Sequence, residues 1–445
     1  MRARLAELVA RLPGKAVTIG VLAACGILFG SAWYQAFTTP PYLYTDEQAH
    51  AGYVLSVQAG HPLPSIDTPT RQQDGGSDLR LKLSFENAAR HDVWVANNPP
   101  YPYVLDALPA ALTRASGVTG GPLLGDRFTN FLCATIAVAL TYALGCELSG
   151  GDRRIGLVAA GILAALPHPS FITSLGLTDG IALLAATANL LVLARLCRRG
   201  PSRAAVIALG LTCAASAAVR PMNLVLAAAC GAIGLALTLK RGTVNRWWAA
   251  VWIGVPTLLT SGWFYLLNLH RYGDATASKA LFKKFDRVTR VPLSVAWHRA
   301  DLWAYVVRVL FNRRIERPVR TEQSWWYQDT TILLRVALLG VIILVIVGIR
   351  RADLVTRFRR FVDRSGTPAE PLETPAVAWA AMLVLVLANA ALLAQFWGGG
   401  GSPNARYLLP SVPIVAAAIA LVVVSVLGRL GGLAVVLAAG ALQLG

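Results

Sequence analysis

Asp46, Glu47 and His50 are the residues whose types and spacing best suit catalysis in this sequence. They follow the first long apolar segment by a few residues. Asp46 and His50 are four positions apart, so they would share one face of a helix. A carboxylate at the mouth of a membrane span could take a proton from a hydroxyl that attacks an anomeric carbon. A phosphate leaving group would need no general acid, unlike the leaving group of a glycosidase, but it would need positive charge nearby.

The same two carboxylates have a structural explanation. Thr45 and Gln48 fit a capping box, and acids in the first turn suit the N-terminus of a helix. We assign both Asp46 and Glu47 to the catalytic site. If capping accounts for one of them, Glu47 is the structural residue and Asp46 carries the chemistry.

Several cationic side chains could stabilise a departing phosphate. Arg406 lies in a glycine-rich turn before a late apolar run, and Arg220 lies in a tight hairpin between two apolar runs. Arg271 and Lys279 follow another run. Arginine suits bidentate recognition of phosphate. In the alternative interpretation, Arg406 extends to the interface at a helix end and the lysines form a solvated face.

Further polar residues could line the same cavity. Asp179 opens an apolar run and could be a second carboxylate or an ordinary acid in a first helical turn. Asn98 and Tyr101 precede a half-apolar run and could bind a sugar, and Tyr407 follows Arg406. A divalent metal is conceivable, with ligands drawn from Asp46, Glu47, His50 and Asp179, but this spacing does not establish a site. No cofactor is predicted with certainty.

The elements that position these residues are membrane helices. The chain has 445 residues, of which 55% are hydrophobic and 14% charged, and its mean hydropathy is +0.54. Soluble domains carry about 25% charged residues, and a bilayer core needs apolar runs of about 20 residues, which occur here repeatedly. The composition therefore predicts an all-α polytopic membrane protein. The net charge of +18 is typical of basic cytoplasmic loops, and we expect no binding to nucleic acid.

The apolar runs predict ten or eleven transmembrane helices. Residues 1–15 form a cytoplasmic N-terminus and 16–445 a single transmembrane domain, with long outer loops at 38–122 and 270–330. Within the first loop, the half-apolar runs 46–59 and 101–113 predict helices that lie in the interface. The predicted spans are 16–37, 123–148, 155–166, 178–199, 204–218, 222–239, 247–269, 331–348, 376–397 and 408–427, with a short last stretch at 430–444.

The basic residues predict the orientation. With the N-terminus inside, the basic clusters that follow alternate spans all lie on the cytoplasmic side, as membrane proteins generally require. The two long loops and all six histidines then lie outside. The predicted active site is therefore on the outer face of the cell membrane.

The motifs resemble those of the GT-C superfamily of membrane glycosyltransferases, in particular the protein mannosyltransferase and aminoarabinose transferase type. The resemblance rests on Asp46-Glu47 after the first span, Asn98-Pro99-Pro100-Tyr101, the short outer turn at 167–179, and the segment from Gly401 through Arg406-Tyr407 to Pro410. It implies a GT-C-like fold, a polyprenyl-phosphate sugar as donor, inverting transfer and Asp46 as the base. It also matches Arg406-Tyr407 to an Arg-Tyr pair of the family. The proline and acid pair are further apart here than in the family, with four residues between Pro41 and Asp46.

The predicted function is transfer of a sugar from a polyprenyl-phosphate donor to a glycan, lipid or protein acceptor, in contact with membrane lipids. One alternative is a flippase or transporter of lipid-linked glycans, which would favour charged or broken helices near the bilayer midplane. The other is a polymerase or ligase of envelope glycans. The clean spans, with polar residues at their outer ends, favour an interfacial enzyme.

Overall fold

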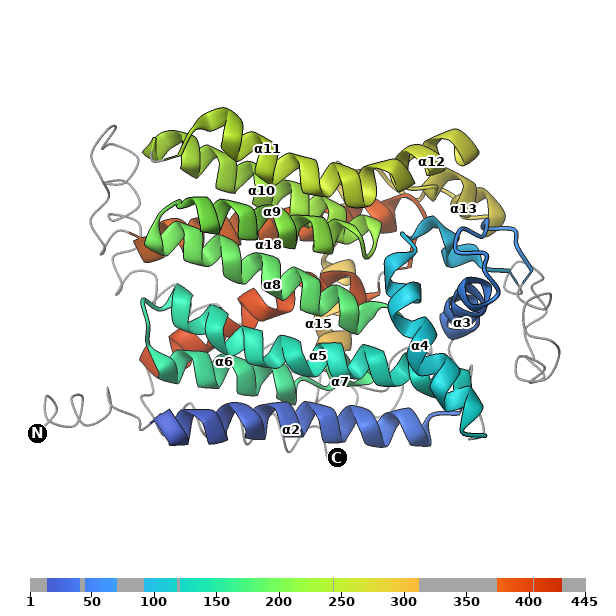
Figure 1. Ribbon diagram of the computed structural model, residues 1–445, viewed down its shortest axis with the longest axis horizontal. Coiled ribbons are helices and arrows are strands. Elements are labelled where there is room, and N and C mark those ends of the chain that lie inside the picture. Colours follow the sequence, from blue (N-terminus) through green and yellow to red (C-terminus); the bar gives the residue numbers. More distant parts are fainter. Residues whose placement is uncertain are drawn as a thin grey trace, which may run out of the picture.

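The computed structural model describes residues 14–40, 45–69, 92–117, 121–242, 244–311, 374–402 and 404–425. These residues form helices and connecting turns, without a β-strand among them (Figure 1). Pro69 and Asp92 make an isolated β-bridge. The prediction of an all-α polytopic membrane protein is confirmed.

Seven of the described helical segments are long and apolar enough to cross a membrane, or eight if one bent pair is a single span. Helix α9 (Arg203–Ala217) is a shorter apolar helix between them. The seven segments are α2 (Gly14–Thr38), the part of α5 (Gly121–Leu148) from Leu123, α8 (Asp179–Arg199), α10 (Pro221–Arg241), Arg246–Tyr272, the part of α18 (Thr374–Gly398) from Ala376, and Ala405–Ser425. The predicted spans at 331–348 and 430–444 lie outside the described residues.

The region predicted as a single span at 155–166 followed by an outer turn has a different form. Helix α6 (Arg153–Ala165) ends before Pro167, and α7 (Pro167–Thr173) continues at an angle of 61° to it. Proline suits the first turn of α7, where its missing N–H leaves no hydrogen bond unmade. The segment Arg246–Tyr272 is continuous through α11 (Arg246–Thr257), a π-helical turn (Leu258–Gly262) and α12 (Trp263–Tyr272).

Helix α5 is the central packing element and lies against α2, α4, α6 and α8. Its contact with α8 is very close at Gly180. A Cβ atom added there would lie 1.9 Å from the carbonyl oxygen of Asn130 on α5. The Asn130 side chain accepts a hydrogen bond from the Gly180 N–H at 2.5 Å and donates to the carbonyl of Leu175 at 2.8 Å. Small residues allow membrane helices to approach in this way.

Helices outside the spans gather at one end of the bundle (Figure 1). They include α3 (Thr45–Gln58), the 3₁₀ turn η3 (Trp94–Asn97), α4 (Tyr101–Ala115) and α13 (Ser278–Lys284). Helix α4 buries Tyr103 and Asp106 and exposes an apolar face, as a helix in the interface would. The exposed face consists of Tyr101, Val104, Leu105, Leu108 and Leu112.

The two outer segments are tied to each other at this end. Asn97 donates to the carbonyl of Thr276 at 3.1 Å. The Lys284 ammonium lies 2.7 Å from Asp67 and 2.6 Å from Asp92. We refer to these contacts as the loop clasp. Asp92 and Lys284 are 192 positions apart in the sequence, so two distant segments form one wall.

We expect Gly180→Ala to destabilise the protein, because the added Cβ would push α8 away from the backbone of α5. Overpacking of this kind costs about 1–3 kcal/mol, and more where backbone must move. The measurement is the free energy of unfolding in mixed micelles. Gly26→Ala is the matched control, because no described atom of another element lies within 4 Å of a Cβ built there. Equal stability of the two variants would contradict the close contact.

Candidate active site

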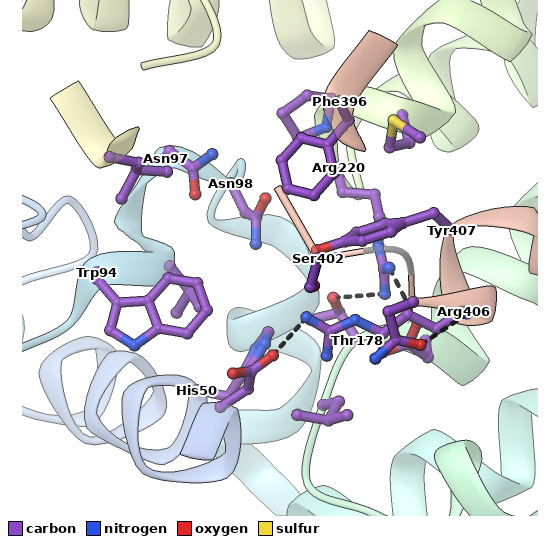
Figure 2. A pocket seen from close by; sticks show the side chains of 18 of the residues that line it. His50, Trp94, Asn97, Asn98, Thr178, Arg220, Phe396, Ser402, Arg406 and Tyr407 are labelled. Carbon is purple, nitrogen blue, oxygen red and sulfur yellow. Dashed lines mark hydrogen bonds and ion pairs between the residues drawn. The ribbon is translucent and has the colours of Figure 1, made fainter. Parts of the chain in front are cut away.

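A cavity of about 460 Å³ lies at the end of the bundle where α3, η3 and α13 meet the ends of the spans (Figure 2). Seven of the predicted site residues line it, and four do not. The seven are Asp46, His50, Asn98, Asp179, Arg220, Arg406 and Tyr407. The four outside it are Glu47, Tyr101, Arg271 and Lys279. The sequence therefore located the cavity but not all of its lining.

The starts of helices position the charged residues of the cavity. Asp179 is the first residue of α8, and Arg220 is the residue immediately before α10. Arg406 lies in the first turn of the 3₁₀ helix η5 (Ala405–Ser411), where the side chain of Asn404 accepts from its backbone N–H at 3.0 Å. Asp46 is in the first turn of α3. Four elements distant in the sequence thus point their ends at one space.

Two arginine–carboxylate pairs occupy this space. Arg406 contacts Asp46, and Arg220 lies 2.9 Å from Asp179 (Figure 2). Arg220 also donates to the hydroxyl of Thr178 at 3.1 Å. The Nε atoms of both arginines are buried and have no hydrogen-bond partner among the described residues. Each guanidinium therefore keeps donor capacity that the protein does not use.

His50 is buried beside these pairs and hydrogen-bonds Tyr103 at 3.1 Å. Burial is the main cause that lowers the pKa of His50 to about 3, while the nearby Asp46 charge opposes this shift to a smaller extent. Tyr103 stacks on Tyr53 with ring centroids 3.8 Å apart and accepts from Asn98 at 3.2 Å. His50 is therefore neutral at physiological pH, and acts as a hydrogen-bonding group with an orientation held by Tyr103.

Glu47 points away from the cavity into a buried ion pair with Arg127 of α5. Both carboxylate oxygens lie 2.9 Å from the guanidinium, and Oε1 also accepts from the Gly176 N–H at 2.8 Å. The same guanidinium donates to the carbonyls of Ala36 and Thr39 at 2.6 and 2.8 Å. Successive helical residues point about 100° apart, so Asp46 and Glu47 cannot face the same space. This geometry corrects the assignment of Glu47 to the catalytic site.

The other three predicted residues outside the cavity have different surroundings. Tyr101 is exposed on the open face of α4. Arg271 donates to the carbonyls of Leu63 and Pro64, which braces the first outer segment. Lys279 is exposed on α13. Their placement in the substrate site was inferred from closeness to a span end, which does not determine where a side chain points.

Several lining residues were not predicted. Trp94 comes from η3, Phe282 from α13, Phe285 from the turn that follows it, and Phe396 from the last turn of α18. Arg287 also lines the cavity. The sequence shows the second outer segment to be basic and aromatic, and this is the signal that could have indicated the lining. Arg127 was hidden because it lies within an apolar run.

No protein-family model matches this sequence, and no curated protein is similar enough in sequence to match it. Solved structures do match in fold. ArnT from Cupriavidus metallidurans, bound to undecaprenyl phosphate, has a TM-score of 0.54 at 14% identity, over 96% of this chain and 64% of ArnT. The chain thus spans less than two thirds of the length of ArnT.

The described chain therefore has the fold of ArnT. The archaeal oligosaccharyltransferase AglB from Archaeoglobus fulgidus, in complex with an inhibitory peptide and a dolichol-phosphate, matches with a TM-score of 0.47 at 13% identity. That match covers 94% of this chain and 50% of AglB.

The residues considered as metal ligands do not form a cluster. Asp46 and Asp179 are each paired with an arginine, and Glu47 is turned toward Arg127. Among the described residues, no group of three or more histidine, cysteine, aspartate or glutamate side chains is arranged to hold a metal ion.

We expect Glu47→Gln to destabilise the protein by about 3–5 kcal/mol, because it leaves the Arg127 charge buried without a counter-charge. Thermal and denaturant unfolding in detergent would measure the loss. The double variant Glu47→Leu with Arg127→Met should recover much of it, because a buried pair can be replaced by apolar groups.

Asp301→Asn is the control for this experiment, because Asp301 pairs with Arg299 on an exposed surface. We expect no measurable change in its stability. A Glu47→Gln variant that is fully stable but inactive would instead indicate that Glu47 has a catalytic role.

Proposed function

We propose that this protein is an inverting glycosyltransferase that moves a sugar from a polyprenyl-phosphate donor to a hydroxyl group of an acceptor. The observation that carries the proposal is the cavity in which Asp46 lies together with Arg220 and Arg406. A proton acceptor and two phosphate-binding side chains are the groups that this reaction requires. The fold of the GT-C type, and the undecaprenyl phosphate bound to ArnT, support it.

The level of the charged residues supports a lipid-linked donor. Asp179 is the first residue of a span, Arg220 immediately precedes another, and Arg406 is the second residue of a third. The span ends lie at the depth of lipid headgroups, where the phosphate of a membrane-anchored donor would also lie. Arginines at this level can bind that phosphate while its hydrocarbon chain stays in the bilayer.

The proposed reaction is a single displacement. The acceptor hydroxyl gives its proton to the Asp46 carboxylate as its oxygen bonds to the anomeric carbon. The bond from that carbon to the phosphate oxygen breaks, and the electron pair leaves with the polyprenyl phosphate. Attack from the face opposite the phosphate inverts the configuration. Arg220 and Arg406 stabilise the charge that develops on the phosphate.

The contact of Arg406 with Asp46 links donor binding to catalysis. A carboxylate held by a guanidinium is a poor proton acceptor, because protonation would break the ion pair. A phosphate that engages Arg406 would weaken its hold on Asp46. Binding of the donor would thereby prepare the base for the acceptor.

The opposite end of the bundle supports the proposed orientation. There Glu147 lies 2.7 Å from Arg198 and 2.5 Å from Arg199, and Arg195 is also within 3.3 Å. Three arginines on one carboxylate leave this end positive, as is typical of the cytoplasmic side. We infer that the N-terminus is cytoplasmic and that the cavity opens on the outer face of the cell membrane.

We expect Asp46→Asn to lower the transfer rate by about 10²–10⁴-fold, because the base is lost. The assay would follow label from a short-chain polyprenyl-phosphate sugar to the acceptor, with folding checked by thermal unfolding. Asp301→Asn, which removes an exposed carboxylate that is not part of the cavity lining, should retain full activity. Normal turnover by Asp46→Asn would refute the assignment of the base.

We expect Arg406→Ala to raise the KM for the donor by about 10-fold or more, because hydrogen bonds to a charged group contribute about 1.5–3 kcal/mol. The KM for the acceptor should change little. Arg406→Lys keeps the charge but not the bidentate geometry, so its donor KM should be intermediate. An unchanged donor KM in Arg406→Ala would argue against a phosphate role.

A further inference from the structure

The cavity has a second part, formed by an aromatic wall of Trp94, Phe282, Phe285, Phe396 and Tyr407. Neighbouring rings are in contact. The ring centroids of Trp94 and Phe285 are 5.4 Å apart, those of Phe282 and Phe396 are 5.7 Å apart, and those of Phe396 and Tyr407 are 5.0 Å apart. Figure 2 shows Trp94 on one side of the cavity and Phe396 and Tyr407 across it.

Arg287 joins the two halves of this wall. Its guanidinium carbon lies 5.4 to 5.8 Å from the ring centroids of Phe282, Phe285 and Phe396. Cation–π attraction at this distance favours the observed packing of the rings. The loop clasp, formed by the contacts of Asn97 with Thr276 and of Lys284 with Asp67 and Asp92, also holds the wall in place. Asn97 is in the same 3₁₀ turn as Trp94, and Lys284 directly precedes Phe285. The wall is therefore built from several segments that hold one another in place.

Part of the aromatic wall lies beyond the level of the charged span ends. Asp179, Arg220 and Arg406 stand at the ends of spans, as Phe396 and Tyr407 do, whereas Trp94, Phe282 and Phe285 belong to segments between spans. These segments gather at the end of the bundle, beyond the spans (Figure 1). A donor held by its phosphate at the span ends would extend its hydrocarbon chain toward the bilayer. Trp94 and Phe285 are on the other side of the phosphate level, where a hydrophilic molecule would enter.

The chemistry of the wall suits a sugar ring. A pyranose or furanose has apolar C–H faces and a polar rim of hydroxyl groups. Aromatic side chains can pack against the C–H faces of the sugar. The amides of Asn97 and Asn98 and the hydroxyls of Ser278 and Ser402 can form hydrogen bonds with the hydroxyl groups of its rim.

We propose that the aromatic wall is the acceptor subsite and that it holds a sugar ring, so that the acceptor is a glycan. This inference rests on the proposed transfer function and specifies its second substrate. The acceptor ring would lie against Trp94 and Phe285, with its attacking hydroxyl directed toward Asp46.

Saturation-transfer NMR on the full chain in nanodiscs would test the subsite. The probes are a panel of neutral disaccharides (mannobiose, galactobiose, arabinobiose and maltose), decyl phosphate as a short lipid phosphate, and a serine- and threonine-containing peptide. The variants are Trp94→Leu, which removes an aromatic face, and Trp94→Phe, which keeps one. Trp247→Leu is the control, because Trp247 is exposed on α11 away from the cavity.

We expect at least one disaccharide to bind, with saturation transferred to its ring C–H protons. Trp94→Leu and Phe285→Leu should each weaken this binding by about five- to tenfold, the range expected for loss of one aromatic contact. Trp94→Phe and Trp247→Leu should bind as the parent does. Decyl phosphate should bind equally well to all of these variants, and about tenfold or more weakly to Arg406→Ala.

Three results would overturn the acceptor assignment. They are absence of binding by the whole disaccharide panel, binding of the peptide that depends on Trp94, and weaker binding of decyl phosphate in Trp94→Leu. The last would show that the wall holds the lipid donor. Failure of decyl phosphate to bind the parent protein would instead contradict the proposed donor, which separates the two inferences.

Discussion

The guanidinium of Arg127 is 3% exposed inside the bundle, so its charge must be neutralised where it lies, and Glu47 is the carboxylate that does so. The pair also binds the carbonyl of Ala36 in the last turn of α2, the carbonyl of Thr39 just after this helix, and the N–H of Gly176. Three segments are thus fixed to α5 at one point. Because α3 begins at this point, the adjacent Asp46 can lie only on the cavity side. The placement of the candidate base follows from a residue that never touches the cavity.

The charges that line the cavity nearly cancel. Arg220, Arg287 and Arg406 face Asp46 and Asp179, which leaves one positive charge in excess among the described lining residues. The phosphodiester of a polyprenyl-phosphate sugar carries one negative charge, whereas a diphosphate-linked sugar carries two. In the proposed reaction, the phosphate would gain negative charge as the sugar leaves and Asp46 would gain a proton, so negative charge would move onto the group that the arginines are proposed to bind. This balance favours a monophosphate-linked donor and tighter binding late in the reaction.

The sequence predicted those parts of the site that lie at the boundaries of apolar runs. Asp179, Arg220 and Arg406 each stand where such a run begins, and a cavity at the span ends follows once the spans are identified. The role of Glu47 could not be predicted, because its partner Arg127 lies 80 residues further on within an apolar run. Arg271 illustrates the converse. It stands near a span end, but its side chain is engaged by backbone carbonyls of the first outer segment.

The aromatic wall shows a different limit of sequence analysis. Its rings come from three regions of the chain, and none of them except Tyr407, which belongs to the Arg406-Tyr407 pair, has a periodicity or a motif that marks it. Phe282 and Phe285 are recognisable as apolar neighbours on a short helix and its end, but the ring that completes their contact, Phe396, is more than 100 positions away. Tertiary packing alone brings these residues to one surface.

The sequence distance between Asp46 and Arg406 affects the order in which the ion pairs of the protein can form during biosynthesis. A chain that enters the membrane from its N-terminus delivers Asp46 among the first outer residues and Arg406 close to the last described span. Until Arg406 is synthesised, the Asp46 carboxylate cannot pair with its guanidinium. Glu47 can form its ion pair with Arg127 as soon as α5 is inserted. The Glu47–Arg127 pair can therefore form before α8, α10 and α18 are made, whereas the cavity acquires its full complement of described charges only when Arg406 follows α18. A chain that ends before Arg406 can hold α3 against α5 without the guanidinium that pairs with Asp46.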